Sequence, residues 1–238
     1  MSAADVLGRV AVGSGLLTAA QVVDNVLVSD AMHEVTLTAP EFGRWTTTPG
    51  QNVRLALGRL SFDVLRTYSI WTHTPERSEL VLRGLDGTGR PDGPGGTWMA
   101  SAEPGSTVLL TGPRGVFRVD PAAPWHLFAG DESGAVPLLA MRAALSPADV
   151  VHGMLEAAGR AGRIPALGAD LPWIDRDDRG LADAVRDLQL PDEPGVAYLA
   201  GEQQACLAIR RYLREERGWP RRSVRVSAHW TPGKRGME

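Results

Sequence analysis

Short bursts of alternating apolar and polar residues fill the first half of the chain, and glycine and proline cluster between them. Alternation with a period of two is typical of β-strands that bury one face. Turn signals such as Pro49-Gly50 separate the runs. Many short strands with such turns predict an antiparallel sandwich or barrel. The expected strands are 22–28, 35–37, 52–57, 68–72, 79–83 and 107–111.

The pattern changes after the Pro/Ala-rich stretch 121–124, which is typical of an inter-domain linker. Short apolar runs now alternate with segments of helical periodicity, as in Leu181, Val185 and Leu188. Strands that alternate with helices indicate βαβ units and a parallel sheet. The expected strands are 125–129, 149–155, 196–200 and 223–228, with helices at 136–145, 179–188 and 203–214.

These patterns predict a β plus α/β fold, in which an N-terminal antiparallel Greek-key β-barrel precedes a Rossmann-like parallel α/β domain. We place an N-terminal extension at residues 1–20, the barrel at 21–120 and the α/β domain at 125–238. Region 157–169 is rich in glycine, alanine and arginine, and we expect it to be a loop.

Composition narrows the functional classes. The 238 residues are 43% hydrophobic and 22% charged, and a formal net charge of -3 offers no basic excess for nucleic acid or an anionic membrane. We expect no signal peptide and no membrane span, because the chain has no apolar stretch of about 20 residues. A single cysteine, Cys206, excludes an intrachain disulfide and favours a reducing compartment. The expected protein is cytoplasmic, and a monomer or weak oligomer.

Sequence motifs for metal and nucleophilic chemistry are missing. The five histidines do not fall at a ligand spacing such as H-E-x-x-H, and neither a G-x-S-x-G elbow nor a Walker motif occurs. The run Asp-Arg-Asp-Asp-Arg at 175–179 is more typical of a solvated turn than of a metal-binding cluster. We therefore predict no metal site.

The segment Arg66-Thr67-Tyr68-Ser69 carries the first candidate chemistry. A guanidinium can clamp a diphosphate, a tyrosine ring can stack on a flat heterocycle, and a hydroxyl can bond a ring nitrogen. Arg66 and Tyr68 would share one face of the strand and Ser69 the other, unless the strand bulges. Together these roles suit a flavin dinucleotide, although alone the pattern is more typical of an exposed arginine and a half-buried tyrosine.

A glycine-rich turn, 93–98, lies downstream and enters a short expected helix. Its backbone N–H groups would be available to a phosphate. A flexible surface loop is the alternative interpretation. Two further turns, 104–105 and 112–115, bracket a strand as the turns of a barrel would.

With these motifs in order, the chain resembles the siderophore-interacting proteins, which are flavin-dependent ferric-siderophore reductases related to ferredoxin–NADP reductases. The resemblance covers nearly the whole chain after residue 20 and depends on the order and spacing of motifs more than on any one of them. The matching segments are 66–69, 81–84, 93–98, 104–105, 112–115, 130–133, 136–137, 200–202, 210–218 and 229–230.

The resemblance implies FAD bound by the barrel, NADPH or NADH as electron donor, and a ferric siderophore or similar chelate as small-molecule substrate. It implies catalytic roles for Tyr68 and Ser69. Because many ferric siderophores are anionic, the basic residues Lys234, Arg235, Arg114 and Arg54 are candidates for contact with the substrate. The implied cofactor-binding residues are Arg66, Tyr68, Ser69, Gly95, Gly96, Thr97, Trp98, Gly130, Asp131, Glu132, Ser133, Gly201, Glu202 and Trp230.

Several of these residues have an ordinary structural alternative. Asp131 or Ser133 would serve equally as a helix N-cap, and Trp230 as a core residue. Arg160 and Arg163 follow an expected strand and are candidates for a 2′-phosphate, although a solvated basic loop is the commoner role for each.

The chain also departs from the family pattern. Arg83 stands where the family often has histidine, Trp71 where it often has arginine, and Gly95 and Gly96 where it has alanine and serine. These departures support a rival hypothesis, because a fold does not fix a function. The rival is a repurposed scaffold that acts on a small organic molecule in a biosynthetic pathway, either without redox chemistry or with flavin only structural.

Overall fold

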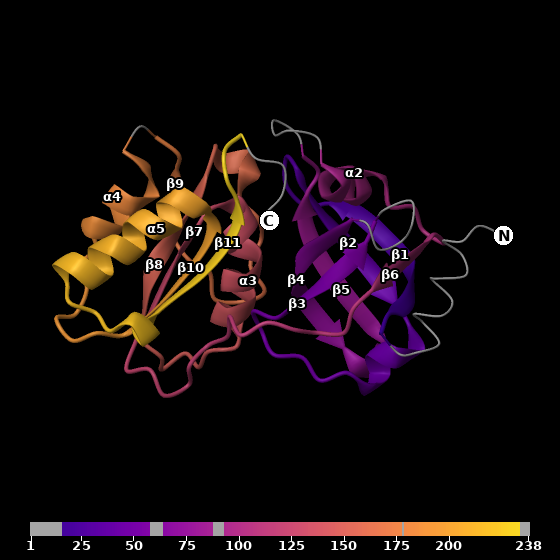
Figure 1. Ribbon diagram of the computed structural model, residues 1–238, viewed down its shortest axis with the longest axis horizontal. Helices are drawn as coiled ribbons and strands as arrows, with labels where there is room; N and C mark the ends of the chain where they lie inside the picture. Colours follow the sequence, from indigo (N-terminus) through magenta and orange to yellow (C-terminus); the bar gives the residue numbers. More distant parts are fainter. Residues whose placement is uncertain (1–15, 58–63, 88–92, 178, 234–238) are drawn as a thin grey trace. The chain divides into compact units, whose positions relative to one another are not determined.

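The computed structural model describes residues 16–57, 64–87, 93–177 and 179–233. The chain divides into two compact units, Met1–Val116 and Phe117–Glu238 (Figure 1). The Pro/Ala stretch 121–124 lies just inside the second unit. The two units are described separately below.

The described strands of the first unit close into an antiparallel barrel in the order β1-β2-β5-β4-β3-β6. Closure pairs β1 with β6 and removes the free edges that an open sheet would expose. Inward-facing aliphatic side chains, such as Val35, Leu37, Leu55 and Leu82, are fully buried and fill the barrel. The strands are β1 (Thr18–Leu27), β2 (Met32–Thr38), β3 (Asn52–Ala56), β4 (Leu65–Thr74), β5 (Glu79–Leu85) and β6 (Thr107–Leu110).

Three short helices accompany the barrel strands in the described part of the first unit. The 3₁₀ helices η1 (Pro40–Arg44) and η2 (Pro75–Arg77) each begin with a proline, which has no N–H to leave unsatisfied at that position. The α-helix α2 (Pro94–Ser101) follows β5 and buries Met99 against the barrel core. This is the short helix expected after the glycine-rich turn.

Strand β4 contains a bulge at Trp71. Its register with β5 shifts between Ile70 and Thr72, so that two consecutive residues, Ile70 and Trp71, are both buried. The Arg83 guanidinium of β5 lies over the Trp71 ring at 3.8 Å and pairs with Glu34 at 2.7 Å. The two departures from the family pattern, Trp71 and Arg83, therefore pack against each other.

The second unit contains a five-stranded parallel sheet in the order β11-β10-β7-β8-β9. Its central strand, β7, is buried at every position, as expected for a strand covered on both faces. The chain passes from β7 to β8 on one side and later to β10 on the other. The strands are β7 (His126–Gly130), β8 (Val151–Ala157), β9 (Trp173–Asp175), β10 (Val196–Glu202) and β11 (Val224–Trp230).

Helices cover both faces of this sheet. Figure 1 shows α3 (Glu132–Ala143) on one face and α4 (Gly180–Arg186) with α5 (Gln203–Arg211) on the other. Residues of α4 and α5 share a buried cluster with Leu127 and Leu199. The remaining elements are short: η3 (Arg160–Gly162), the π-helical turn η4 (Tyr212–Glu216) and η5 (Arg221–Ser223).

The predicted fold class is confirmed, and the differences are local. The segment expected to be one helix, 203–214, is divided between α5 and η4. The region expected to be a loop, 157–169, contains η3. Strand β9 was not predicted, because three residues are too few to display a period of two.

Candidate functional site

The structure brings Arg66 and Tyr68 of β4 against the start of α2. A Cβ atom added to Gly95 would lie 2.8 Å from Tyr68 Oη and 3.4 Å from Arg66 Cγ. On the β5 side, a Cβ at Gly84 would lie 2.7 Å from the Tyr68 ring. Two glycines thus make room for this tyrosine, and Trp98 completes the group with its ring 6.0 Å from that of Tyr68.

The electrostatics of this cluster are those of a cation beside a neutral phenol. Burial raises the pKa of Tyr68 above its ordinary value, and the charge of Arg66 opposes the shift only in part. Arg66 Nη1 donates to the carbonyl of Leu65 at 2.9 Å, and no carboxylate of the described residues pairs with Arg66. The remaining donors of the guanidinium are therefore suited to an anion.

The N-terminus of α2 has no side-chain cap within the described residues. Gly93 is its N-cap, Pro94 has no N–H, and the amide of Thr97 donates to the Gly93 carbonyl at 3.1 Å. The amides of Gly95 and Gly96 lie in the first turn, where the helix has no internal partner for them. An uncapped helix start beside Arg66 has the chemistry of a phosphate site.

Of three other predicted residues, the structure describes two, Ser69 and Arg114. Ser69 pairs with Asn52 of β3, and by strand alternation its side chain lies on the face opposite Tyr68. Arg114 is exposed, and its backbone bonds to Asn52 at 2.9 Å in each direction. Lys234 lies outside the described residues.

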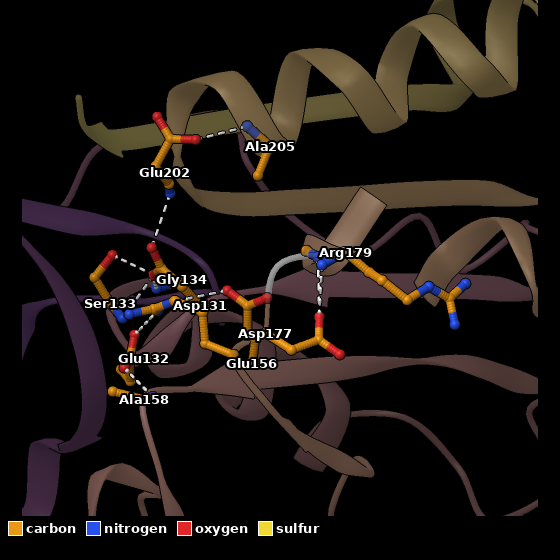
Figure 2. Close-up of polar contacts among 12 residues, drawn as sticks. Asp131, Glu132, Ser133, Gly134, Glu156, Ala158, Asp177, Arg179, Glu202 and Ala205 are labelled. Carbon is orange, nitrogen blue, oxygen red and sulfur yellow. Dashed lines mark hydrogen bonds and ion pairs between the residues drawn. The ribbon is translucent and has the colours of Figure 1, made fainter. Parts of the chain in front are cut away.

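In the second unit, Asp131 joins three elements, and Figure 2 shows its contacts with α3 and with Glu202 of β10. Its Oδ1 accepts hydrogen bonds from the amides of Ser133 and Gly134 at 2.8 and 3.0 Å, so it is the N-cap of α3. Its Oδ2 accepts from the amide of Glu202 at 2.9 Å and from Trp230 Nε1 at 2.6 Å. The N-cap alternative for Asp131 is therefore the observed role.

Glycine is required where these elements meet. Gly201 has φ +119°, and a Cβ there would collide with the Asp131 carboxylate. A Cβ at Gly134 would collide with the carbonyl of Ala200. The glycines at positions 134 and 201 therefore allow α3 and β10 to approach closely, which explains why both turns contain glycine.

Proline inside α3 explains the position of His229. Pro137 has no N–H, so the carbonyl of Ser133, four residues earlier, lacks its helical donor. His229 Nδ1 lies 3.1 Å from that carbonyl and must donate to it, because a carbonyl can only accept. Together with Trp230, this contact fixes the end of β11 to the start of α3.

A partly buried ion cluster lies at the same end of the sheet. Arg176 Nη2 pairs with Glu132 at 2.6 Å, and Arg176 Nε pairs with Glu156 at 2.9 Å. Glu132 also accepts the amide of Ala158 at 2.9 Å (Figure 2). The described residues of the run 175–179 are exposed, as expected of a solvated turn, and Arg176 in addition bridges two carboxylates that are each only 7% exposed. The available signal was Glu156, an acidic residue at the end of an apolar strand.

These groups surround a cavity of about 280 Å³ within the second unit. It opens at the carboxyl ends of β7, β8, β10 and β11, where ligands bind in open α/β sheets. Arg160 is exposed, and Arg163 pairs with Asp175 at 2.7 Å. The residues that line the cavity are Asp131, Glu156, Arg176, Asp177, Gly180, Leu181, Ala200, Glu202, Ala205, Cys206, Trp230 and Pro232.

Two kinds of feature are absent from the described residues. No helix among them has both the length and the apolar character needed to cross a membrane. They also contain no cluster of three or more histidine, cysteine, aspartate or glutamate side chains arranged to hold a metal ion.

A closed antiparallel barrel followed by a parallel α/β sheet defines the class of ferredoxin–NADP reductase-like folds. A solved siderophore utilization protein from T. fusca superposes with a TM-score of 0.74 at 24% identity, covering 93% of this chain and 95% of that one. Residues 123–233 match the family described as siderophore-interacting protein. The resemblance to this family that the sequence motifs predicted is therefore confirmed, and the family model covers most of the second unit.

Two curated relatives match a large part of the chain. An uncharacterised Mycobacterium tuberculosis protein is 33% identical over 176 residues, covering 66% of this chain and 59% of that protein. The ferric vibriobactin reductase ViuB of Vibrio cholerae is 30% identical over 185 residues, covering 72% of this chain and 66% of ViuB. The matched part of the chain thus spans less than two thirds of the length of these relatives.

Proposed function

We propose that the protein is a flavin-dependent reductase that passes electrons from NADH or NADPH through FAD to a ferric siderophore or a similar ferric chelate. The observation that carries the proposal is the uncapped start of α2 beside Arg66 and Tyr68. Likeness to ViuB, which is named a ferric vibriobactin reductase, supports the choice of electron acceptor.

The barrel residues fit a flavin dinucleotide. Arg66 and the amides of Gly95 and Gly96 would bind the diphosphate, and a side chain at position 95 would occupy the space against Tyr68 and Arg66. By contrast, the first-turn amides of α3 and α5 are already bonded to Asp131 and Glu202. Among these helices, α2 therefore has the start best suited to a diphosphate.

Six other predicted residues have roles in the proposal. Tyr68 would pack on the ring system and Ser69 would bond a ring nitrogen, while Thr97 and Trp98 line the first turn of α2. When bound, FAD would accept two electrons from the nicotinamide and donate them one at a time, so that one dinucleotide would reduce two ferric ions. Arg114 and Lys234 would attract an anionic ferric chelate.

The rival hypothesis loses its main support. It requires Trp71 to form a stacking surface for an organic ligand, but Trp71 is only 5% exposed and lies beneath the Arg83 guanidinium. Arg83 in turn is held by Glu34. The pair is better explained as barrel packing than as the wall of a new substrate pocket.

Flavin binding is tested by titrating purified protein with FAD. We expect a yellow protein, and Arg66→Ala should weaken FAD binding by about 10–100-fold, since hydrogen bonds to a charged group are worth about 1.5–3 kcal/mol. The matched control is Arg77→Ala, which removes an exposed barrel arginine paired with Glu79. Equal FAD affinity in the two variants would contradict the assigned role of Arg66.

Electron transfer is tested anaerobically. Addition of NADH or NADPH should bleach the flavin absorbance, and addition of ferric citrate should restore it with release of ferrous iron. The double variant Arg114→Ala and Lys234→Ala should slow reduction of the anionic chelate and leave bleaching unchanged. If neither dinucleotide bleaches the flavin, the proposed reaction is wrong.

A further inference from the structure

The cavity of the second unit contains one buried acceptor that the protein does not use. Glu156 Oε2 bonds to Arg176, but Glu156 Oε1 is buried and has no hydrogen-bond partner among the described residues. A buried carboxylate oxygen without a donor is costly, and it usually indicates a ligand or water. Glu156 lies at the carboxyl end of β8 and lines the cavity.

The other carboxylates around the cavity are already occupied. Both oxygens of Asp131 accept N–H groups, and Glu202 caps α5 through the amides of Gln204 and Ala205 at 2.8 and 2.7 Å. Asp177 accepts the amide of Arg179 and is exposed to water. Glu156 is therefore the buried carboxylate of this group that can accept a hydrogen bond from a ligand.

The charge of the cavity selects the ligand further. Four carboxylates and one arginine line it, and that arginine, Arg176, is bonded to both Glu132 and Glu156. A phosphate placed here would face an excess of negative charge, and like charges repel strongly at a buried site. A sugar hydroxyl meets no such repulsion and can donate to Glu156 Oε1.

We propose that this cavity binds the adenosine ribose of a nicotinamide dinucleotide without a 2′-phosphate, with Glu156 accepting a hydrogen bond from a ribose hydroxyl. The inference rests on the proposed function and names its electron donor, NADH. Dinucleotide-binding folds in general use an acidic residue near the end of the second strand to bond the ribose 2′-hydroxyl of NADH. A nearby arginine instead accommodates the 2′-phosphate of NADPH.

The cavity walls suit the adenine ring beside that ribose. Leu181 and Pro232 offer apolar contacts, and the Trp230 indole is fixed in place by Asp131. A volume of about 280 Å³ is near the lower limit of small-molecule pockets, so it accommodates a nucleoside and not a whole dinucleotide.

Binding of nucleotide fragments tests the inference without any redox step. Isothermal titration calorimetry of the flavin-loaded protein should show 5′-AMP binding at least about tenfold more tightly than 2′,5′-ADP, because the extra phosphate meets the carboxylates. Glu156→Gln retains the shape and removes one negative charge, so it should reduce this preference about fivefold or more. Glu193→Gln, an exposed change of the same charge in the same unit, should leave the preference unchanged.

Three outcomes would overturn the inference: tighter binding of 2′,5′-ADP than of 5′-AMP by the unmodified protein, no binding of either, or an unchanged preference in a folded Glu156→Gln variant. If that variant fails to fold, the comparison of the two nucleotides on the unmodified protein still decides. Flavin bleaching by NADPH more efficiently than by NADH would likewise refute the inference and leave the proposed reductase function intact.

Discussion

Asp131 connects α3, β10 and β11, so its replacement tests the architecture of the second unit directly. In Asp131→Ala, α3 loses its N-cap, which costs about 0.5–2 kcal/mol. The amide of Glu202 and the indole of Trp230 also lose this acceptor, and a buried donor deprived of its acceptor costs about 1–3 kcal/mol. We therefore expect the free energy of unfolding to fall by about 3 kcal/mol.

Two further variants separate the causes. Asp131→Asn retains one acceptor oxygen but presents an amide NH₂ where two N–H donors point, so the loss should be about 2 kcal/mol. The control is Asp149→Ala, which removes one hydrogen bond to the amide of Ser146 in an exposed turn. It should cost less than about 1 kcal/mol.

The measurement is urea unfolding followed by the helical band of far-ultraviolet circular dichroism. Among the described residues, the second unit contributes α3, α4 and α5 to this band and the first contributes α2. The transitions of the two units need separate fits, because a two-domain chain need not unfold in one step. If Asp131→Ala shifted the urea midpoint no further than Asp149→Ala does, the three-way connection would be refuted.

Two other predictions concern the second unit. Burial, followed by two nearby carboxylates, raises the pKa of the Cys206 thiol from 9.0 to about 12. The thiol should therefore resist a disulfide reagent at pH 8 until urea unfolds the protein. The contribution of this thiol to the free energy of unfolding should be fully present below pH 9 and lost between pH 9 and 12, and the loss should be smaller in Cys206→Ala. Arg176→Ala leaves two buried carboxylates without their cation and should lower the free energy of unfolding by about 2–4 kcal/mol. An unchanged urea midpoint would exclude this loss. Arg179→Ala, which breaks an exposed pair, should leave that midpoint unchanged.

The barrel could be predicted in detail because its signals are local. Alternation places Val35, Leu37, Leu80 and Leu82 on the inner face of β2 and β5, and the same residues are fully buried in the structure. Glycine and proline mark the turns between strands. The bulge at Trp71 could not be predicted, since it depends on how β5 packs beside β4.

The α/β unit was predictable in its order of elements but not in its contacts. Periodicity indicated helices and strands, and the acidic turn after β7 suggested an N-cap. The bonds from Asp131 to Glu202 and Trp230 join residues separated by 71 and 99 positions. Such partners are determined by the strand order β11-β10-β7, which one sequence without relatives does not specify.

The same limit explains why the proposed cofactor residues of the two units differ in how far the sequence alone could indicate them. In the barrel, Arg66 and Tyr68 are two positions apart on one strand, and alternation alone places them on a common face. In the α/β unit, the role proposed for Glu156 depends on what its neighbours already bind. Arg176 bonds to one of its oxygens, and the oxygens of Asp131 and Glu202 accept capping bonds. A buried acceptor is recognised by what its neighbours have already bonded, so Glu156 is evident only once every other carboxylate at that end of the sheet has been assigned a partner.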